Sequence, residues 1–219
     1  MSTFQLTDDL YFPPVSESDK DGLVAIGGDL SSDRLMLAYQ SGIFPWYNDD
    51  EPIMWYSPDP RFVLLPDKLY VSRSMRSVLR KEEFTVTFNQ DFEGVINSCR
   101  QMQRSGQDGT WITEEMVEAY IKLNKLGHAQ SVEVWKDNEL VGGMYGINLG
   151  TVYCGESMFS KASNASKVAL IVFIQKFKEE GGQLYDCQAY TDHMASMGAE
   201  MIERNEFLKY LDNVQNPSA

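Results

Sequence analysis

The chain reads Ser131-Val-Glu-Val-Trp135, Leu140-Val-Gly-Gly-Met-Tyr-Gly146 and Thr151-Val-Tyr-Cys-Gly-Glu-Ser-Met-Phe159, and these three segments decide its fold. Asp137-Asn138 separates the first two segments, and Asn148-Leu149-Gly150 separates the last two. Asn, Asp and Gly tolerate the positive φ angles that tight hairpin turns require. Short segments joined by such turns predict three strands in an antiparallel meander.

A helix and a further strand follow this meander. Apolar spacing predicts a helix from Asn164 to Glu180, closed by Gly181-Gly182, and Leu184-Tyr-Asp-Cys-Gln188 has the pattern of a strand. A helix that crosses over between two strands predicts a βαβ unit, so we expect an α/β (α+β) fold with a mixed sheet. Such a sheet opens a cleft at its strand ends. The polar residues expected there are Glu156, Asp186 and Gln188.

Length and composition describe a globular protein. The chain has 219 residues, 43% hydrophobic and 23% charged, which suits one large domain or a small lobe attached to a medium one. Residues 1–9 contain no secretory signal, and no run is long enough to span a membrane. Cys99, Cys154 and Cys187 are an odd number at no metal-like spacing, which is typical of reduced thiols. We therefore expect a cytoplasmic protein.

The charge is negative overall but unevenly distributed. A formal net charge of −13 argues against indiscriminate binding of nucleic acid, because phosphates require Lys and Arg. Residues 61–81 form a basic segment that could bind a few phosphates, or could be a solvated helix face that balances nearby acids. Its charged residues are Arg61, Lys68, Arg73, Arg76, Arg80 and Lys81 against Asp67 alone.

The first 62 residues are expected to form a small lobe. Residues 10–30 have the pattern of a loop, with Gly27-Gly28 in a turn because no phosphate-loop ending follows them. Ser31 is the expected N-cap of a helix that Gly42 ends. Residues 42–61 place five aromatics among prolines, a pattern that we interpret as neither regular helix nor central strand. These rings either pack between lobes or stack on a flat ligand.

Regular periodicity begins near residue 62, where we place the boundary between the small lobe (1–62) and a larger domain (63–219). Strands are predicted over 62–65 and 84–88, and helices over 72–81 and 91–102. A polar loop is expected over 104–108. A further helix begins after the cap Thr113 and ends at Gly127.

Few residues offer catalytic chemistry. His128 and His193 lie at no spacing typical of a metal site, and a Cys187–His193 nucleophile pair has no nucleophile signature around it. Asp186 and Gln188 are two residues apart on one predicted strand, so regular alternation places them on the same face. An acid and an amide facing a cleft can orient an attacking amine, whereas on a sheet edge they are simply solvated.

A series of short motifs runs in order through the chain: Gly22-Leu-Val-Ala-Ile-Gly-Gly-Asp-Leu-Ser31, Ala38-Tyr-Gln-Ser-Gly-Ile-Phe-Pro-Trp46, Ser57-Pro-Asp-Pro-Arg61, Ser72-Arg-Ser74, Gly109-Thr-Trp-Ile112, Gly155-Glu-Ser-Met-Phe-Ser160, Asn164-Ala-Ser-Lys167 and Asp186-Cys-Gln188, together with the first two strand segments above. Each motif alone is weak, but the set and its order are specific. On these motifs the chain closely resembles the bacterial leucyl/phenylalanyl-tRNA–protein transferase family across nearly its whole length.

The resemblance implies a small N-terminal lobe joined to a domain with the acetyltransferase-like (GNAT) fold. It implies an aminoacyltransferase that moves leucine or phenylalanine from charged tRNA to the N-terminal Lys or Arg of a protein, which marks that protein for degradation. The partners are then Leu-tRNA or Phe-tRNA and the acceptor protein or peptide. Because an aminoacyl ester is already activated, no metal or other cofactor is expected. We also expect a monomer that does not contact membranes.

The resemblance also assigns roles to the polar residues. Asp186 and Gln188 are the expected catalytic residues, with Gln188 nearest the reaction and Asp186 orienting Gln188 or the incoming amine. Gln188 is expected to align the amine rather than to take its proton, because an amide is very weakly basic. Glu156 is expected to match the cationic side chain of the acceptor, or else to hold the loop after it. Asp186→Ala is expected to slow transfer with little loss of folding.

Three further sets of residues are candidates for binding the charged tRNA. The apolar side chain of the transferred amino acid needs a pocket. Six residues can supply it, although their helical or strand spacing is equally typical of ordinary core residues: Met144, Tyr153, Leu170, Phe173, Phe177 and Tyr185. The candidates for stacking on the 3′-terminal adenosine are Trp46, Trp111 and Tyr120. The candidates for binding acceptor-stem phosphates are Arg73, Arg76, Arg80 and Lys81.

Two other functions stay open at this point. An N-acyltransferase that uses acyl-CoA is the alternative activity for this fold. It needs a glycine-rich turn for the pyrophosphate, where this chain has Ser160-Lys-Ala-Ser-Asn-Ala-Ser-Lys167. A non-catalytic module that binds tRNA or protein N-termini is the other alternative, against which the pair Asp186 and Gln188 argues.

Overall fold

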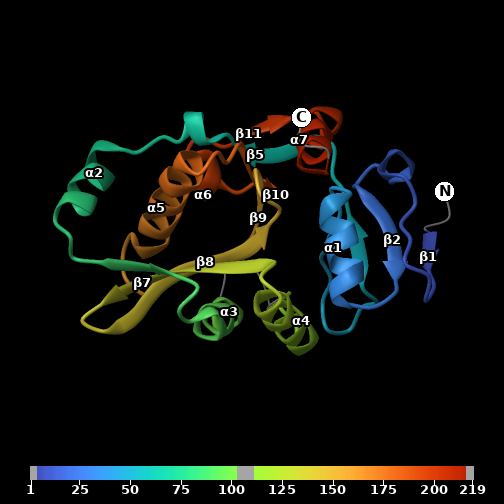
Figure 1. Ribbon diagram of the computed structural model, residues 1–219, viewed down its shortest axis with the longest axis horizontal. Helices are drawn as coiled ribbons and strands as arrows, with labels where there is room; N and C mark the ends of the chain where they lie inside the picture. Colours follow the sequence, from blue (N-terminus) through green and yellow to red (C-terminus); the bar gives the residue numbers. More distant parts are fainter. Residues whose placement is uncertain (1–3, 103–110, 216–219) are drawn as a thin grey trace.

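The computed structural model describes residues 4–102 and 111–215, which form two sheets surrounded by helices (Figure 1). The small sheet has the strand order β1 (Phe4–Leu6), β2 (Leu23–Gly27), β4 (Met54–Tyr56) and β3 (Phe44–Pro45). The large sheet has the strand order β11 (Glu200–Ile202), β5 (Arg61–Leu64), β10 (Leu184–Gln188), β9 (Val152–Ser160), β8 (Glu139–Asn148), β7 (Ala129–Lys136) and β6 (Thr85–Phe88). The α-helices are α1 (Ser32–Gln40), α2 (Arg73–Arg80), α3 (Phe92–Gln101), α4 (Glu114–Lys125), α5 (Ala165–Glu179), α6 (Asp192–Ala195) and α7 (Arg204–Gln215). Gly109, Thr110 and the loop expected over 104–108 lie outside the described residues.

The large sheet has the mixed topology that the sequence predicts. β7, β8 and β9 pair antiparallel, and β9 pairs parallel with β10 after the crossover helix α5. In the turn between β7 and β8, Asp137 and Asn138 have φ angles of 53° and 64°. These are the left-handed conformations for which Asn and Asp are suited. The predicted meander and βαβ unit are both confirmed.

Side chains of the large sheet alternate between two cores. Tyr153 and Tyr185 point to the face that α5 covers, whereas their neighbours Cys154 and Leu184 belong to the core shared with α1, α3 and α4. Figure 1 shows α5 on one side of β8 and β9, with α3 and α4 on the other. Because alternate side chains of a strand point to opposite faces, these strands serve both cores and are apolar almost throughout.

The small sheet corrects two predictions. β2 occupies Leu23–Gly27, where the sequence predicts a loop, and β4 is an internal strand formed by the aromatic segment. Pro52 and Pro58 lie just outside β4, so no proline interrupts its ladder of hydrogen bonds. Trp55 is fully buried, and its indole Nε1 donates to the carbonyl of Gly27 at 2.9 Å. The exclusion of a central strand was therefore wrong, because a strand of three residues fits between these prolines.

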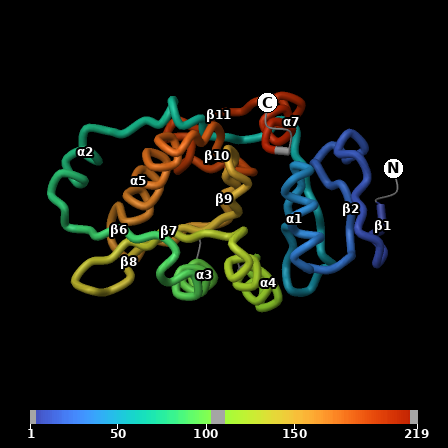
Figure 2. Tube along the Cα trace, in the orientation of Figure 1, coloured from blue at the N-terminus to red at the C-terminus, as the bar shows by residue number. Residues whose placement is uncertain are grey.

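The molecule is elongated, with α2 at one end of its long axis and the small sheet at the other (Figure 1, Figure 2). Leu35 and Tyr39 of α1 belong to the same buried cluster as Tyr145 and Val152 of the large sheet, so one core spans both sheets. The boundary expected at residue 62 falls inside β5, a strand of the large sheet. Within residues 4–102 and 111–215, no helix combines the length and hydropathy needed to cross a bilayer.

Candidate active site

Glu156 and Asp186 lie on one face of two neighbouring parallel strands. In the pairing of β9 with β10, Asp186 lies opposite Cys154, two residues before Glu156. A register shift between Asp186 and Gln188, and a φ angle of 64° at Gln188, then interrupt β10. Irregularities of this kind re-aim a side chain. The Nε2 atom of Gln188 consequently donates to Oε1 of Glu156 at 2.7 Å, and Gln188 joins the other two residues in one site.

Glu156 is the centre of a hydrogen-bond network that draws on four elements. Tyr39 of α1 donates from its hydroxyl to Oε1 at 2.7 Å, and Tyr120 of α4 donates to Oε2 at 3.1 Å. The two tyrosine hydroxyls also contact each other, but because each has a single proton and donates it to Glu156, neither donates to the other in this arrangement. With the amide of Gln188, three donors hold the carboxylate of Glu156 in one orientation.

The surroundings of Glu156 bring its titration close to neutral pH. Burial raises the pKa of this carboxyl from 4.5 to about 7, although the hydrogen bonds from Tyr39, Gln188 and Tyr120 favour the charged form. Burial also raises the pKa values of Tyr39 and Tyr120 well above 10, so both hydroxyls stay protonated as donors. A carboxyl perturbed in this way beside a cavity is typical of a functional site.

Asp186 is fully buried and forms a two-point ion pair with Arg61. The guanidinium Nε and Nη2 atoms donate to Oδ1 and Oδ2 at 2.8 and 2.7 Å. The guanidinium carbon lies 4.8 Å from the ring centroid of Phe44 and 4.6 Å from that of Phe207. Oδ1 of Asp186 also accepts the backbone N–H of Gln188 at 2.9 Å. Asp186 therefore acts on the site through the backbone that positions Gln188.

This burial changes what is expected of Asp186→Ala. The sequence predicts little loss of folding on the assumption that Asp186 faces a cleft. Its removal would leave the guanidinium of Arg61 buried without its acid, which is strongly destabilising in proteins. The expectation does not hold for a carboxylate in this position.

Two adjoining cavities meet at Glu156. The apolar cavity has a volume of about 380 Å³, and its wall includes Glu156, Met158, Phe159, Tyr185, His193 and Met194. The aromatic cavity has a volume of about 260 Å³, and its wall includes Phe44, Trp46, Trp111, Glu156, Gln188 and Tyr190. Glu156, Cys187 and Thr191 line both cavities. A molecule that occupies both cavities would therefore contact Glu156, beside which Gln188 lies on the wall of the aromatic cavity.

The thiol of Cys187 is not placed to act as a nucleophile. Burial, and after it the charge of Asp186, raises the pKa of Cys187 well above its ordinary 9.0. The thiolate is the nucleophilic form of cysteine, and this environment disfavours it. The open alternative of a Cys187–His193 pair loses its basis.

The six residues predicted to form the amino-acid pocket separate into two groups. Tyr185 lines the apolar cavity. The other five pack in the core between α5 and the sheet and line neither cavity: Met144, Tyr153, Leu170, Phe173 and Phe177. This corrects their predicted place, because their apolar spacing serves the packing of α5 on the sheet. Tyr153 and Phe173 nevertheless contact the ring of Tyr185, at centroid distances of 5.6 and 6.1 Å, and so hold part of the cavity wall.

The three residues predicted to stack on adenosine also separate. Trp46 and Trp111 both line the aromatic cavity, and Trp46 is 42% exposed. Tyr120 is fully buried, and its hydroxyl is hydrogen-bonded to Glu156. Its ring has no free face for a base, so this prediction is corrected: Tyr120 supports Glu156 instead.

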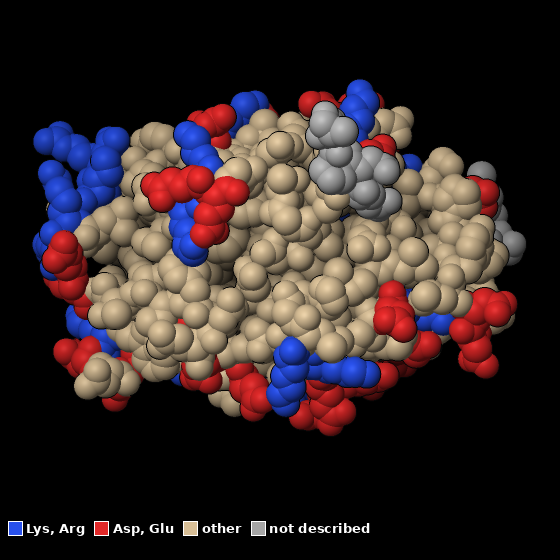
Figure 3. All heavy atoms as spheres, in the orientation of Figure 1, with Lys and Arg blue, Asp and Glu red and all other residues tan. Residues whose placement is uncertain are grey.

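The four residues predicted to bind phosphate are exposed on α2 and at its C-terminal end. Arg73, Arg76 and Arg80 line a shallow hollow of about 330 Å³, and Lys81 lies next in the chain within 3.7 Å of Glu83. Figure 3 shows Lys and Arg side chains gathered at the α2 end of the molecule. We call these four residues the α2 surface, of which Lys81 is paired with an acid and the three arginines line the hollow.

The α2 surface is smaller than the basic segment of the sequence. Arg61 is only 1% exposed and is neutralised by Asp186, and Lys68 forms an ion pair with Glu200. A charge count along the sequence cannot separate such residues from free ones, because their partners lie more than a hundred residues away.

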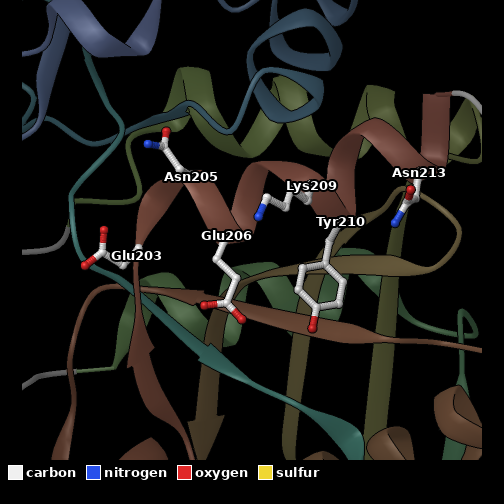
Figure 4. Close-up of a pocket in the computed structure, with 6 residues that line it drawn as sticks. All are labelled: Glu203, Asn205, Glu206, Lys209, Tyr210 and Asn213. Carbon is white, nitrogen blue, oxygen red and sulfur yellow. The ribbon is translucent and has the colours of Figure 1, made fainter.

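A further hollow, of about 640 Å³, runs along the outer face of α7 (Figure 4). It is lined by Glu203, Asn205, Glu206, Lys209, Tyr210 and Asn213, all from α7 or the residue before it. It contains none of the predicted site residues. A polar groove along a single helix face has no second wall, so it is not a candidate active site.

Sequence reasoning missed two residues of the network. Tyr39 has the spacing of an ordinary core residue of α1, and Arg61 counts as part of a basic segment. Both belong to motifs that carry the family resemblance, Ala38–Trp46 and Ser57–Arg61. These motifs mark both residues as candidates. Their roles depend on contacts with Glu156 and Asp186, which lie far away in the sequence and cannot be predicted from a local pattern.

Comparison with known structures finds remote similarity. "The structure of L-PGS from Bacillus licheniformis" matches with a TM-score of 0.42 and 12% identity, covering 79% of this chain and 57% of that one. A GCN5-related N-acetyltransferase from Kribbella flavida matches with a TM-score of 0.35 and 11% identity, covering 76% and 59%. This chain thus spans a little over half the length of either. Scores this low carry no argument about function.

Comparison with known sequences is decisive. The family described as leucyl/phenylalanyl-tRNA protein transferase matches residues 63–212, and its N-terminal domain matches residues 28–59. A leucyl/phenylalanyl-tRNA–protein transferase of Flavobacterium johnsoniae is 57% identical over 208 residues, covering 95% of this chain and 98% of the relative. One from Christiangramia forsetii is 58% identical over 202 residues, covering 91% and 95%. The chain therefore belongs to the leucyl/phenylalanyl-tRNA–protein transferase family.

Proposed function

We propose that this chain moves leucine or phenylalanine from charged tRNA to the N-terminal Lys or Arg of a protein. The observation that carries the proposal is the meeting of the apolar and aromatic cavities at Glu156, to which Gln188 is hydrogen-bonded, in a chain of this family. The 3′-terminal aminoacyl-adenosine has one apolar part and one flat aromatic part joined by the reactive ester. Two adjoining cavities of matching character suit such a molecule.

The aromatic cavity takes the adenosine, with Trp46 and Trp111 as the rings on which the base stacks. The apolar cavity takes the side chain of leucine or phenylalanine, against Met158, Phe159 and Met194. The ester then lies beside Gln188, at the junction of the two cavities. The small lobe (1–62) supplies Phe44 and Trp46 to the aromatic cavity, and the larger domain (63–219) supplies Trp111 and the residues of the apolar cavity.

The role of Gln188 is to align the incoming amine. Its Nε2 is engaged by Glu156, so its carbonyl oxygen is the atom left to accept a hydrogen bond from the amine. Asp186 fixes the backbone of Gln188, and Glu156 fixes its side chain. Alignment of this kind accelerates aminolysis of an ester that is already activated.

The net charge of the chain is consistent with a cationic acceptor. A formal net charge of −13 favours encounter with a cationic N-terminus bearing Lys or Arg. Contact with tRNA is then confined to the α2 surface and the two cavities. We propose a monomer that works in the cytoplasm, where charged tRNA is present.

The direct test is transfer of labelled amino acid. Purified protein, incubated with tRNA charged with radiolabelled leucine or phenylalanine, is expected to label a peptide that begins with Arg. Digestion of the charged tRNA beforehand, or acetylation of the peptide N-terminus, is expected to abolish the label. Labelling that persists after digestion, or that leucyl-CoA supports equally well, would contradict the proposal and favour the acyl-CoA alternative.

A second prediction concerns the α2 surface. Arg76→Glu with Arg80→Glu is expected to raise the KM for charged tRNA roughly tenfold. The salt dependence of tRNA binding is expected to become weaker by the amount that corresponds to the loss of about two phosphate contacts. Both residues are exposed, so thermal stability should stay within the range of ordinary surface changes. Lys122→Glu with Lys209→Glu makes the same charge change on α4 and α7 and serves as the matched control. An equal effect of the two pairs would mean that only net charge matters.

A further inference from the structure

The transfer reaction proposed above places negative charge on one oxygen atom. When the amine attacks the aminoacyl ester, the electron pair of the C=O bond moves to the carbonyl oxygen and forms an oxyanion. Hydrogen-bond donors that are fixed in place before the reaction stabilise such an oxygen, and they usually make the largest single contribution to catalysis. The reaction therefore needs a donor at the place where the ester lies.

Three side chains line both the apolar and the aromatic cavity, and so lie at the junction where the ester is expected: Glu156, Cys187 and Thr191. Glu156 accepts hydrogen bonds through both carboxylate oxygens and has no proton to give in this arrangement. The thiol of Cys187 is a weak donor, and its Sγ already donates to the carbonyl of Tyr185 at 3.9 Å. Thr191 is the remaining donor of the three.

The hydroxyl of Thr191 is held in place and keeps a free proton. Its Oγ1 accepts the backbone N–H of Met194 at 3.2 Å, as the N-cap of α6. A hydroxyl that accepts a hydrogen bond in this way still has one proton to donate. No group of the described residues accepts that proton, and Thr191 is an exposed residue. The proton is therefore available to a molecule at the junction.

The residues on either side of Thr191 fix the segment between β10 and α6. Thr191 follows Gln188, which aligns the amine, by three residues. The hydroxyl of Tyr190 donates to Asp192 at 2.9 Å, and the ring of Tyr190 packs against Phe62 at a centroid distance of 5.1 Å. These contacts and the N-cap bond fix the position of the Thr191 hydroxyl before substrate binds. A donor fixed in this way stabilises developing charge without reorganisation during the reaction.

We infer that the hydroxyl of Thr191 donates a hydrogen bond to the carbonyl oxygen of the aminoacyl ester and to the oxyanion that forms from it. This inference rests on the proposed function. Attack of the amine forms the C–N bond and moves the C=O electron pair to the oxygen that Thr191 contacts. The pair then returns, the C–O bond to the ribose breaks, and one amine proton passes to the 3′ oxygen. Atoms and charge balance without any co-reactant, and Thr191 keeps its own proton throughout.

Replacements of Thr191 separate donation from helix capping. Thr191→Val keeps the shape of the side chain without the hydroxyl, and Thr191→Ser keeps the hydroxyl. Thr191→Asp keeps an oxygen that caps α6 but has no proton to donate at neutral pH. With charged tRNA and a peptide that begins with Arg, we expect the Val and Asp variants to lower kcat roughly 100-fold, the usual effect of removing one such donor. The Ser variant is expected to retain most of the activity.

Binding of an unreactive analogue distinguishes this role from positioning of the substrate. In 3′-amino-3′-deoxyadenosine acylated with leucine, an amide replaces the ester, so the molecule can occupy both cavities without transfer. Its inhibition constant is expected to rise less than about tenfold in Thr191→Val, because a hydrogen bond between neutral groups is worth less than one to an oxyanion. The kcat of the same variant is expected to fall much further.

Ser196→Ala is the matched control. It removes a hydroxyl from the other end of α6, at a residue that lines neither cavity, and we expect no change in kcat. An unchanged kcat in Thr191→Val, or analogue binding that weakens as much as kcat falls, would overturn the role of Thr191. Full activity of Thr191→Asp would also overturn it, because capping alone would then suffice. Failure of the unaltered protein to use charged tRNA would instead overturn the proposed function.

Discussion

Replacing Arg61 by methionine is expected to lower the free energy of unfolding by about 3–5 kcal/mol. The change leaves the carboxylate of Asp186 fully buried, without the two-point ion pair that now neutralises it. It also removes the guanidinium from between the rings of Phe44 and Phe207 and leaves the carbonyl of Gly42 without its donor. Urea unfolding followed by circular dichroism measures the loss.

Two controls separate the buried charge from general damage. Arg100→Met breaks an ion pair with Glu114 at the surface and is expected to cost less than about 1 kcal/mol. Arg61→Met combined with Asp186→Asn removes both charges while keeping an acceptor for the backbone N–H of Gln188. The double variant is expected to be more stable than the sum of the single losses predicts. Strict additivity would mean that the ion pair does not hold the two strands together.

We expect the transfer activity of Arg61→Met to fall by more than the loss of folded protein alone explains. Asp186 accepts the backbone N–H of Gln188 at the point where β10 is irregular. A carboxylate that shifts after losing Arg61 moves that backbone, and with it the amide that aligns the amine. Misplacement of about 1 Å can cost roughly a hundredfold in rate. Transfer by the folded fraction of Arg61→Met should therefore be strongly reduced.

The same ion pair shows why the sequence predicts some parts of the site and not others. Strands β7 to β10 and helix α5 follow from local apolar patterns and turn residues, and the structure confirms them. Arg61 and Asp186 are 125 residues apart, so their pairing exists only after β5 and β10 lie side by side. Before that, Arg61 is one more positive charge in a basic segment.

The sequence alone also cannot distinguish residues that line a pocket from residues that pack in the core. Both kinds are apolar, so the spacing that makes Leu170 and Phe173 face the sheet is the same whether a ligand or another side chain lies opposite. The structure places both in the core and leaves Tyr185 on the cavity wall. Tyr120 is a similar case, because its aromatic ring suggests stacking whereas its hydroxyl decides its position beside Glu156.

Glu156 is expected to make the stability of the protein depend on pH in a way that Glu156→Gln removes. The pKa of this carboxyl is raised by burial from 4.5 to about 7 in the folded protein. Between these two values the folded state holds the proton more tightly than the unfolded state. Stability from this group is therefore present at low pH and is lost as pH rises from about 4.5 to 7. The full change amounts to about 3 kcal/mol.

Glutamine keeps the shape of the side chain and cannot titrate. Its amide can still accept from Tyr39 and donate to the hydroxyl of Tyr120, so the network loses its charge without losing its contacts. Unfolding free energies at pH 5 and pH 8 provide the measurement. The variant is expected to gain stability relative to the unaltered protein as pH rises, by about 2.5 kcal/mol between pH 5 and pH 8.

Taking the difference between the two proteins cancels the contributions of other titrating groups, including His193, whose lowered pKa acts in the opposite direction. A difference that stays constant with pH would show that Glu156 titrates at its ordinary value, and that its carboxylate remains charged throughout the range in which transfer takes place.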